Sequence, residues 1–137
     1  QCPVVRGRAR MTQTLLAFDF GTRRVGVACG NTLMRQAQPL RSIAAEGDAR
    51  FAQIKKLIVE WQPDALVVGV PFHPDGAAHA VTEQARRFAR QLHGRFQLQV
   101  HEVDERYSSV EAERDDPDDL DAASAAVILQ QFFNENP

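Results

Sequence analysis

The sequence predicts an α/β fold with a mixed five-stranded sheet flanked by helices, for three reasons. Five short apolar segments have the length of strands, and amphipathic segments of helical period follow the third, fourth and fifth of them. The first two strands are joined by a short Gly-containing connection, which favours an antiparallel hairpin. The later strands are separated by helices, and helical crossovers make consecutive strands parallel.

The first three strands form the predicted antiparallel part of the sheet. Residues 14–20 (TLLAFDF) are apolar and end at Gly21, and residues 25–29 (VGVAC) supply the second strand of the hairpin. A third strand is expected within residues 33–43. Pro39 favours an edge position for this strand, because proline cannot donate a hydrogen bond to a further neighbour.

The rest of the chain alternates helices and strands. Residues 48–61 predict a helix that ends before Pro63, and residues 65–70 (ALVVGV) predict a strand covered on both faces. Residues 80–91 predict a second helix, which Gly94 terminates. A fifth strand at 97–103, a short helix at 109–114 and a last helix at 119–133 complete the expected order.

Composition indicates one globular domain. The 137 residues are 44% hydrophobic and 25% charged, and no apolar run reaches the roughly 18 residues that a membrane span needs. Two cysteines cannot form a disulfide framework, so we expect a cytoplasmic protein that does not contact a membrane. We interpret residues 1–10 as a tag remnant or a disordered basic arm and residues 11–137 as the domain. A net charge of −2 does not identify a nucleic-acid binder.

Asp19 is the most informative residue. It lies inside an otherwise apolar strand, where an unpaired carboxylate would be costly to bury. Buried charges are usually paired or bound to metal, so we expect Asp19 to have such a partner. The alternative is that its carboxylate accepts hydrogen bonds from the amides of Gly21 and Thr22 in the following turn.

Two further carboxylate positions are candidates. Asp104, Glu105 and Arg106 directly follow the predicted fifth strand, where ligands gather in α/β sheets, although a solvated loop would also explain them. Asp121 shares a face of the last predicted helix with Ala125, although capping of the helix N-terminus would also explain it. Each site taken alone is ambiguous.

Convergence of these carboxylates at one sheet edge would create a divalent-metal site. Mg²⁺ and Mn²⁺ prefer oxygen ligands, and a pair of such ions can promote phosphodiester hydrolysis. The candidate contacts to nucleic-acid phosphates are one hydroxyl and three guanidinium groups, those of Thr22, Arg23, Arg24 and Arg106. The segment 111–121 carries seven acidic residues and one arginine, which opposes binding of a phosphate backbone.

Five sequence pieces in order resemble the YqgF/RuvX family: DFGTRRVGVA from Asp19, QPL from Gln38, VVGVP from Val67, DER from Asp104 and DAASAAVILQ from Asp121. The resemblance implies an RNase H-like fold and a cytoplasmic bacterial nuclease that matures the 5′ end of precursor 16S rRNA. It implies Asp19, Glu105 and Asp121 as the catalytic and metal-binding residues, with Glu105 preferred over Asp104.

The expected partners are therefore structured RNA and the ribosome, and the chain is expected to be a monomer or homodimer. Three alternatives remain. The chain is a Holliday junction resolvase acting on branched DNA, a non-catalytic nucleic-acid or ribosome-assembly module, or a phosphotransferase of the sugar-kinase and actin-like type. The last normally requires two such domains around ATP.

Overall fold

The computed structural model describes residues 12–72, 81–105 and 117–136, and its description of side chains omits position 105 and positions 117–120. The predicted basic arm at 1–10, the short helix at 109–114 and Arg106 lie outside these ranges. All statements below concern the described part of the chain.

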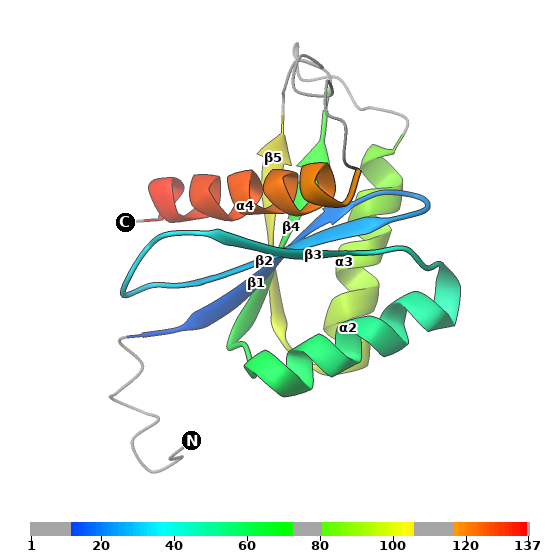
Figure 1. Ribbon diagram of the computed structural model, residues 1–137, viewed down its shortest axis with the longest axis horizontal. Helices are drawn as coiled ribbons and strands as arrows, with labels where there is room; N and C mark the ends of the chain where they lie inside the picture. Colours follow the sequence, from blue (N-terminus) through cyan, green and yellow to red (C-terminus); the bar gives the residue numbers. More distant parts are fainter. Residues whose placement is uncertain (1–11, 73–80, 106–116, 137) are drawn as a thin grey trace.

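A mixed five-stranded sheet forms the centre of the fold, in the order β3-β2-β1-β4-β5 (Figure 1). Strands β1 (Thr14–Phe20), β2 (Val25–Asn31) and β3 (Gln38–Ile43) are antiparallel neighbours. Strands β4 (Ala65–Pro71) and β5 (Gln99–Glu105) run parallel to β1. The predicted meander, its edge strand and the parallel second half are therefore confirmed.

Three helices cover the two faces of this sheet. Helices α2 (Gly47–Trp61) and α3 (Thr82–Phe96) pack on one face, and α4 (Pro117–Glu135) crosses the other face (Figure 1). Each face has its own apolar cluster. Phe18, Phe51 and Phe88 lie in the cluster under α2 and α3, whereas Leu15 and Phe133 lie in the cluster under α4.

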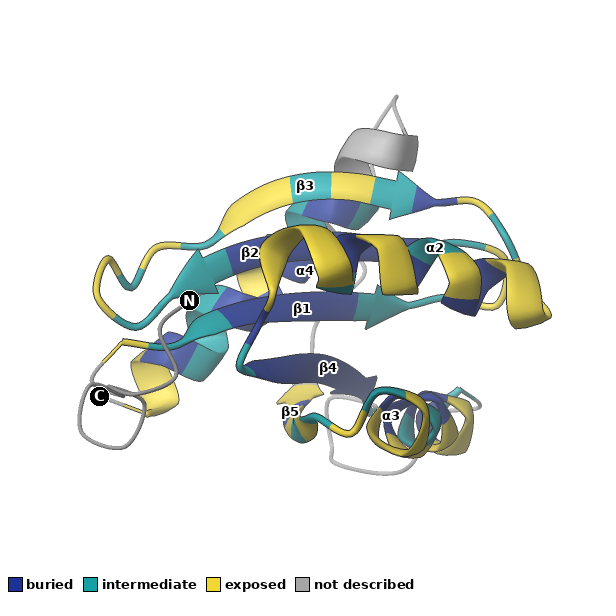
Figure 2. Cartoon of the chain, turned by 90° about the horizontal axis from the view of Figure 1, so that it is seen from below, coloured by how far each residue is buried: buried dark blue, intermediate teal, exposed yellow. Residues whose placement is uncertain are grey.

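Burial follows the strand positions closely. All seven residues of β4 are buried, as its continuous apolar sequence predicts for a strand covered on both faces (Figure 2). The edge strand β3 is largely exposed or half-buried and contains Pro39. Cys29 of β2 is buried, in agreement with its predicted place in the core. No helix within residues 12–72, 81–105 and 117–136 is long and apolar enough to span a membrane.

Several predicted boundaries differ from the structure: β2 ends two residues later than expected, α4 is two residues longer at each end, and α3 and β5 are also shifted. Helix α3 continues through Gly94 to Phe96 and ends at Gln97, whose φ of 59° is left-handed. A glycine costs a helix only about 1 kcal/mol, and burial of Leu92 on the preceding turn offsets that cost. Strand β5 begins and ends two residues later than expected. Asp104 and Glu105 are therefore its last two residues and do not follow it.

Candidate active site

Asp19 lies on the α4 face of the sheet, between two glycines. It pairs with Gly26 of β2 on one side and with Gly69 of β4 on the other. It alternates in register with Leu15 and Ala17, which pack under α4. Because neither glycine has a side chain, the strand neighbours of Asp19 place no Cβ atom beside its carboxylate.

Gly26 also sets how closely α4 approaches the sheet. A Cβ atom at position 26 would lie 1.9 Å from the backbone oxygen of Asp121, so only glycine allows this approach. Asp19 is the register partner of Gly26, and the close approach therefore brings Asp121 near Asp19. The structure brings these two residues, far apart in the sequence, close enough for the charge of Asp121 to act on Asp19.

Hydrogen bonds from two other elements hold the Asp121 carboxylate. Its Oδ2 accepts a hydrogen bond from Arg24 Nε at 2.6 Å and another from Ser42 Oγ at 2.9 Å. Asp121 is the fifth residue of α4, and the donors to its side chain come from the β1–β2 turn and β3. Its partners therefore differ from those of a capping residue. Arg24, predicted as a phosphate contact, forms an ion pair with Asp121 in this structure.

The surroundings of Asp19 disfavour the ionised form of its carboxylate. Burial, and secondarily the negative charge of Asp121, raise the pKa of Asp19 from 3.8 to about 7. In the described residues the amides of Gly21 and Thr22 do not donate to Asp19, so the turn does not supply the stabilisation considered from the sequence. A nearby cation would relieve both effects, because it stabilises the ionised form.

The end of β5 separates Asp104 from Glu105. Asp104 pairs with Val70 and is exposed, and Glu105 pairs with Pro71, one residue further along β4. Successive strand positions alternate between the two faces, so position 105 belongs to the α4 face with Val103 and Asp19, and position 104 belongs to the opposite face.

The three helices also anchor this edge of the sheet. Each donates a side-chain hydrogen bond to a backbone carbonyl there: Arg50 Nη2 of α2 to Thr22 (3.2 Å), Thr82 Oγ1 of α3 to Pro71 (2.5 Å) and Gln131 Nε2 of α4 to Asp104 (3.0 Å). Arg50 is buried, with a relative exposure of 5%, and this burial lowers the pKa of its guanidinium group. Its Nε donates to the Ala45 carbonyl at 2.8 Å. Thr22 and Arg23 are exposed at the surface of the anchored turn.

Sequence reasoning missed three residues that shape the site. Ser42 orients Asp121, Arg50 anchors the β1–β2 turn, and Gly26 admits α4. Only Gly26 carries a recognisable signal, because a glycine inside an apolar strand often marks a close approach of another backbone. Ser42 and Arg50 carry no comparable signal, because ordinary surface residues of a strand and a helix have the same sequence pattern.

The donor set at this edge fits a hard divalent cation. Asp19 and Asp121 supply carboxylate oxygens, which Mg²⁺ and Mn²⁺ prefer. Burial of Asp19, and secondarily the negative charge of Asp121, raise the pKa of Asp19, and a bound cation would offset both. Among the side chains that the structure describes, no three His, Cys, Asp or Glu residues are grouped to hold a metal ion, and the side chain at position 105 is not among them.

Comparison with known proteins agrees with this geometry. The family model described as RuvX, Holliday junction resolvase, matches residues 13–135. A protein of Albidiferax ferrireducens named "Putative pre-16S rRNA nuclease" is 64% identical over 121 residues, which cover 88% of this chain and 78% of the relative. A protein of Polaromonas sp. with the same name is 60% identical over 125 residues, covering 91% of each chain.

Solved structures show the same fold at low sequence identity. RuvC of T. thermophilus, solved in complex with a Holliday junction substrate, matches with a TM-score of 0.56 and 14% identity over 90% of this chain and 94% of RuvC. This likeness confirms the expected RNase H-like fold. Because the family model and both relatives cover most of its length, the chain belongs to the RuvX, Holliday junction resolvase, family.

Proposed function

We propose that this chain is a divalent-metal-dependent endonuclease that hydrolyses phosphodiester bonds of structured nucleic acid and matures the 5′ end of precursor 16S rRNA in the cytoplasm. The observation that carries the proposal is the convergence of Asp19 and Asp121 across Gly26. The names of the two bacterial relatives support the substrate, and the family match supports nuclease chemistry.

Asp19, Asp121 and Glu105 are the proposed metal ligands. The first two lie on the α4 face, and the register gives position 105 the same face of the sheet. A bound Mg²⁺ or Mn²⁺ pair supplies activation of a water nucleophile and stabilisation of the leaving oxygen. Asp104 is not a proposed ligand, because its position belongs to the opposite face.

The other residues of the site orient the ligands and the substrate. Arg24 and Ser42 both donate to Oδ2 of Asp121, which fixes the direction of that carboxylate. Arg23 and Thr22 are exposed on a turn that Arg50 anchors, so they are placed to contact a phosphate. Arg106 is a further proposed phosphate contact and lies outside the described residues.

Branched DNA is the second candidate substrate. The matched family model is described as a Holliday junction resolvase, and RuvC shares the fold. The carboxylate chemistry would be the same for both polymers, because the metal ligands act on the phosphodiester and not on the sugar or base. The substrates can therefore be separated only by direct comparison.

The proposal is tested by cleavage of end-labelled precursor 16S rRNA and of a four-way DNA junction, in Mg²⁺, Mn²⁺ or EDTA. We expect metal-dependent cutting of the RNA at the mature 5′ end, lost in Asp19→Asn. Preferential cutting of the junction would instead favour the resolvase. Binding of either polymer without cleavage, equal in wild type and Asp19→Asn, would favour a non-catalytic binding module and contradict the proposal.

A further inference from the structure

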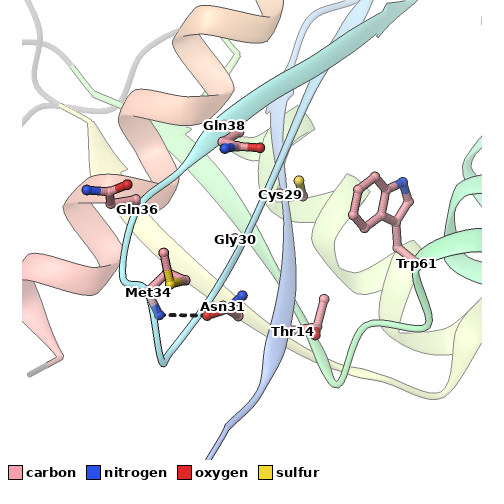
Figure 3. A pocket seen from close by; sticks show the side chains of 8 residues that line it. All are labelled: Thr14, Cys29, Gly30, Asn31, Met34, Gln36, Gln38 and Trp61. Atoms are coloured by element: carbon pink, nitrogen blue, oxygen red, sulfur yellow. Dashed lines mark hydrogen bonds between the residues drawn. The ribbon is translucent and has the colours of Figure 1, made fainter. Parts of the chain in front are cut away.

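A groove of about 240 Å³ lies at the end of β1 opposite to Asp19 (Figure 3). It exists because β3 first pairs with β2 at Gln38, opposite Cys29, so the last two residues of β2 have no partner on β3. Trp61, at the end of α2, forms one wall of the groove, and Met34 lies in the connection that leads to β3.

The lining combines an aromatic ring with carboxamide groups. The Trp61 side chain is partly exposed, and Gln36 and Gln38 are exposed. Within the described part of the chain, neither glutamine side chain forms a hydrogen bond. Asn31 differs, because its Oδ1 accepts hydrogen bonds from the backbone amides of Leu33 and Met34 and so fixes the turn.

This chemistry is suited to an unstacked nucleobase. Proteins recognise such bases by stacking them on aromatic rings and by hydrogen bonding to their edges, and a carboxamide can both donate and accept. The groove is smaller than the roughly 300–1,000 Å³ of sites that enclose drug-sized ligands. It therefore has room for one base but not for a large cofactor.

Strand β3 connects this groove to the carboxylate site. Gln38 lines the groove and Ser42 donates to Asp121, four residues further along β3. The two sites lie on opposite faces of the sheet, because Gln38 pairs with Cys29 of the cluster under α2 and α3, whereas Ser42 pairs with Gly26 beneath α4. Arg41 lies between them, exposed on the edge strand.

We propose that the groove binds one unstacked base of the nucleic-acid substrate, whose strand passes over the exposed edge strand β3 to the carboxylate site. Trp61 stacks on the base, Gln36 and Gln38 hydrogen bond to its edge, and Arg41 contacts an intervening phosphate. This inference rests on the proposed function for its ligand class and adds a second point of substrate recognition.

Trp61 is the only tryptophan of the chain, so its fluorescence reports directly on the groove. The wild-type chain in EDTA, which prevents cleavage, is titrated with a single-stranded ribonucleotide octamer and with an abasic octamer of equal length. We expect saturable quenching by the octamer and none by the abasic chain, because the abasic chain keeps the phosphates but lacks the bases.

Binding is then measured independently by fluorescence anisotropy of the labelled octamer. Loss of one stacking contact in Trp61→Leu should weaken binding roughly 5- to 150-fold. Gln38→Ala, on the exposed edge strand, should weaken binding by a smaller factor. Val59→Ala is the matched control, because Val59 is an exposed apolar residue of the same helix as Trp61 and does not line the groove.

Equal quenching by both octamers, or octamer binding with no change in Trp61 fluorescence, would overturn the inference. A fluorescence change that follows protein concentration without RNA would also overturn it, by identifying the groove as an interface between copies of the chain. Cleavage in Mg²⁺ separates the two proposals. If the chain cuts RNA but the octamer does not quench Trp61, only the base-site proposal is refuted. If the octamer quenches Trp61 but the chain does not cut RNA, only the nuclease proposal is refuted.

Discussion

Gly26 lies directly beneath the backbone of Asp121, and this contact joins the last helix to the central sheet. A Cβ atom at position 26 would lie 1.9 Å from the Asp121 oxygen and 2.3 Å from its carbonyl carbon. The obstacle is backbone, which cannot rotate away as a side chain can. The separation between α4 and β2 therefore decides whether the Asp121 carboxylate reaches Asp19.

Gly26→Ala should displace α4 and destabilise the fold. We expect a loss of about 3 kcal/mol in the free energy of unfolding, at the upper end of the cost of overpacking, because backbone must move. Gly94→Ala is the matched control, since nothing lies within 4 Å of a Cβ there and it stands inside α3. That change should raise stability by about 0.5–1 kcal/mol. Urea denaturation of both variants checks the pair, and equal stability would refute the proposed contact.

The pH dependence of stability should reveal Asp19. Its pKa is about 7 in the folded chain against 3.8 for an ordinary aspartate, so between these values the folded state holds a proton that the unfolded state has released. The free energy of unfolding in EDTA should therefore fall as the pH rises from about 4 to about 7. Asp19→Asn removes this loss and should be more stable than the wild type at pH 8, by at most about 4 kcal/mol. Parallel pH profiles for the two proteins would exclude the effect.

Metal binding should restore the stability that the wild type loses when Asp19 ionises, and it should have no such effect on Asp19→Asn. Addition of Mg²⁺ at pH 8 should raise its melting temperature, because an ion that binds only the folded state stabilises it. Asp19→Asn should show little change. Differential scanning calorimetry with matched NaCl controls measures the shift, and equal shifts in both proteins would place the bound ion elsewhere.

Ser42 is expected to position Asp121 for metal binding. Ser42→Ala removes one of the two donors to Asp121 Oδ2 and should lower metal affinity roughly 10-fold, as loss of a group that orients a ligand typically does. Ser124→Ala, one turn along α4, is the matched control, since the Ser124 side chain forms no hydrogen bond with the described residues. Calorimetric titration with Mn²⁺ compares the two, and identical affinities would remove Ser42 from the site.

Arg50 should act on substrate binding through the β1–β2 turn. Arg50→Met removes the donor to the Thr22 and Ala45 carbonyls, and a hydrogen bond from a charged group contributes about 1.5–3 kcal/mol. We expect a raised KM for RNA with a nearly unchanged kcat, because the loosened turn carries the proposed phosphate contacts and no metal ligand. Arg87→Met, an exposed arginine of α3, controls for the lost charge. An unchanged KM would show that Arg50 serves stability only.

The strands and helices were largely predictable because their apolar periodicity reflects burial directly. The continuous apolar run of β4 and the spacing of Phe88 and Leu92 each predict the faces found in the structure. Boundaries were less accurate where tertiary packing overrode a local preference, as at Gly94. The two-residue error in β5 has the same origin, since strand length there depends on pairing with β4.

The sequence singled out Asp19 and Asp121, which the structure brings together, but not the residues that surround them. Asp19 is conspicuous in an apolar strand, whereas Ser42 and Arg50 become informative only when distant segments are brought together. The sequence also left Asp104 and Glu105 equivalent, apart from the family resemblance. Only the register with β4 assigns these two positions to opposite faces.

The most direct measurement is single-turnover cleavage of precursor 16S rRNA in saturating Mg²⁺ by Asp19→Asn, Asp121→Asn, Glu105→Gln and Asp104→Asn. We expect the first three to lose roughly 100-fold or more, the magnitude for loss of a group that stabilises a transition state. Asp104→Asn should stay within a few-fold of the wild type, because position 104 belongs to the other face of the sheet. Cleavage by Asp19→Asn at the wild-type rate would contradict a metal centre on the α4 face. An equal loss of rate in Asp104→Asn and Glu105→Gln would contradict it as well.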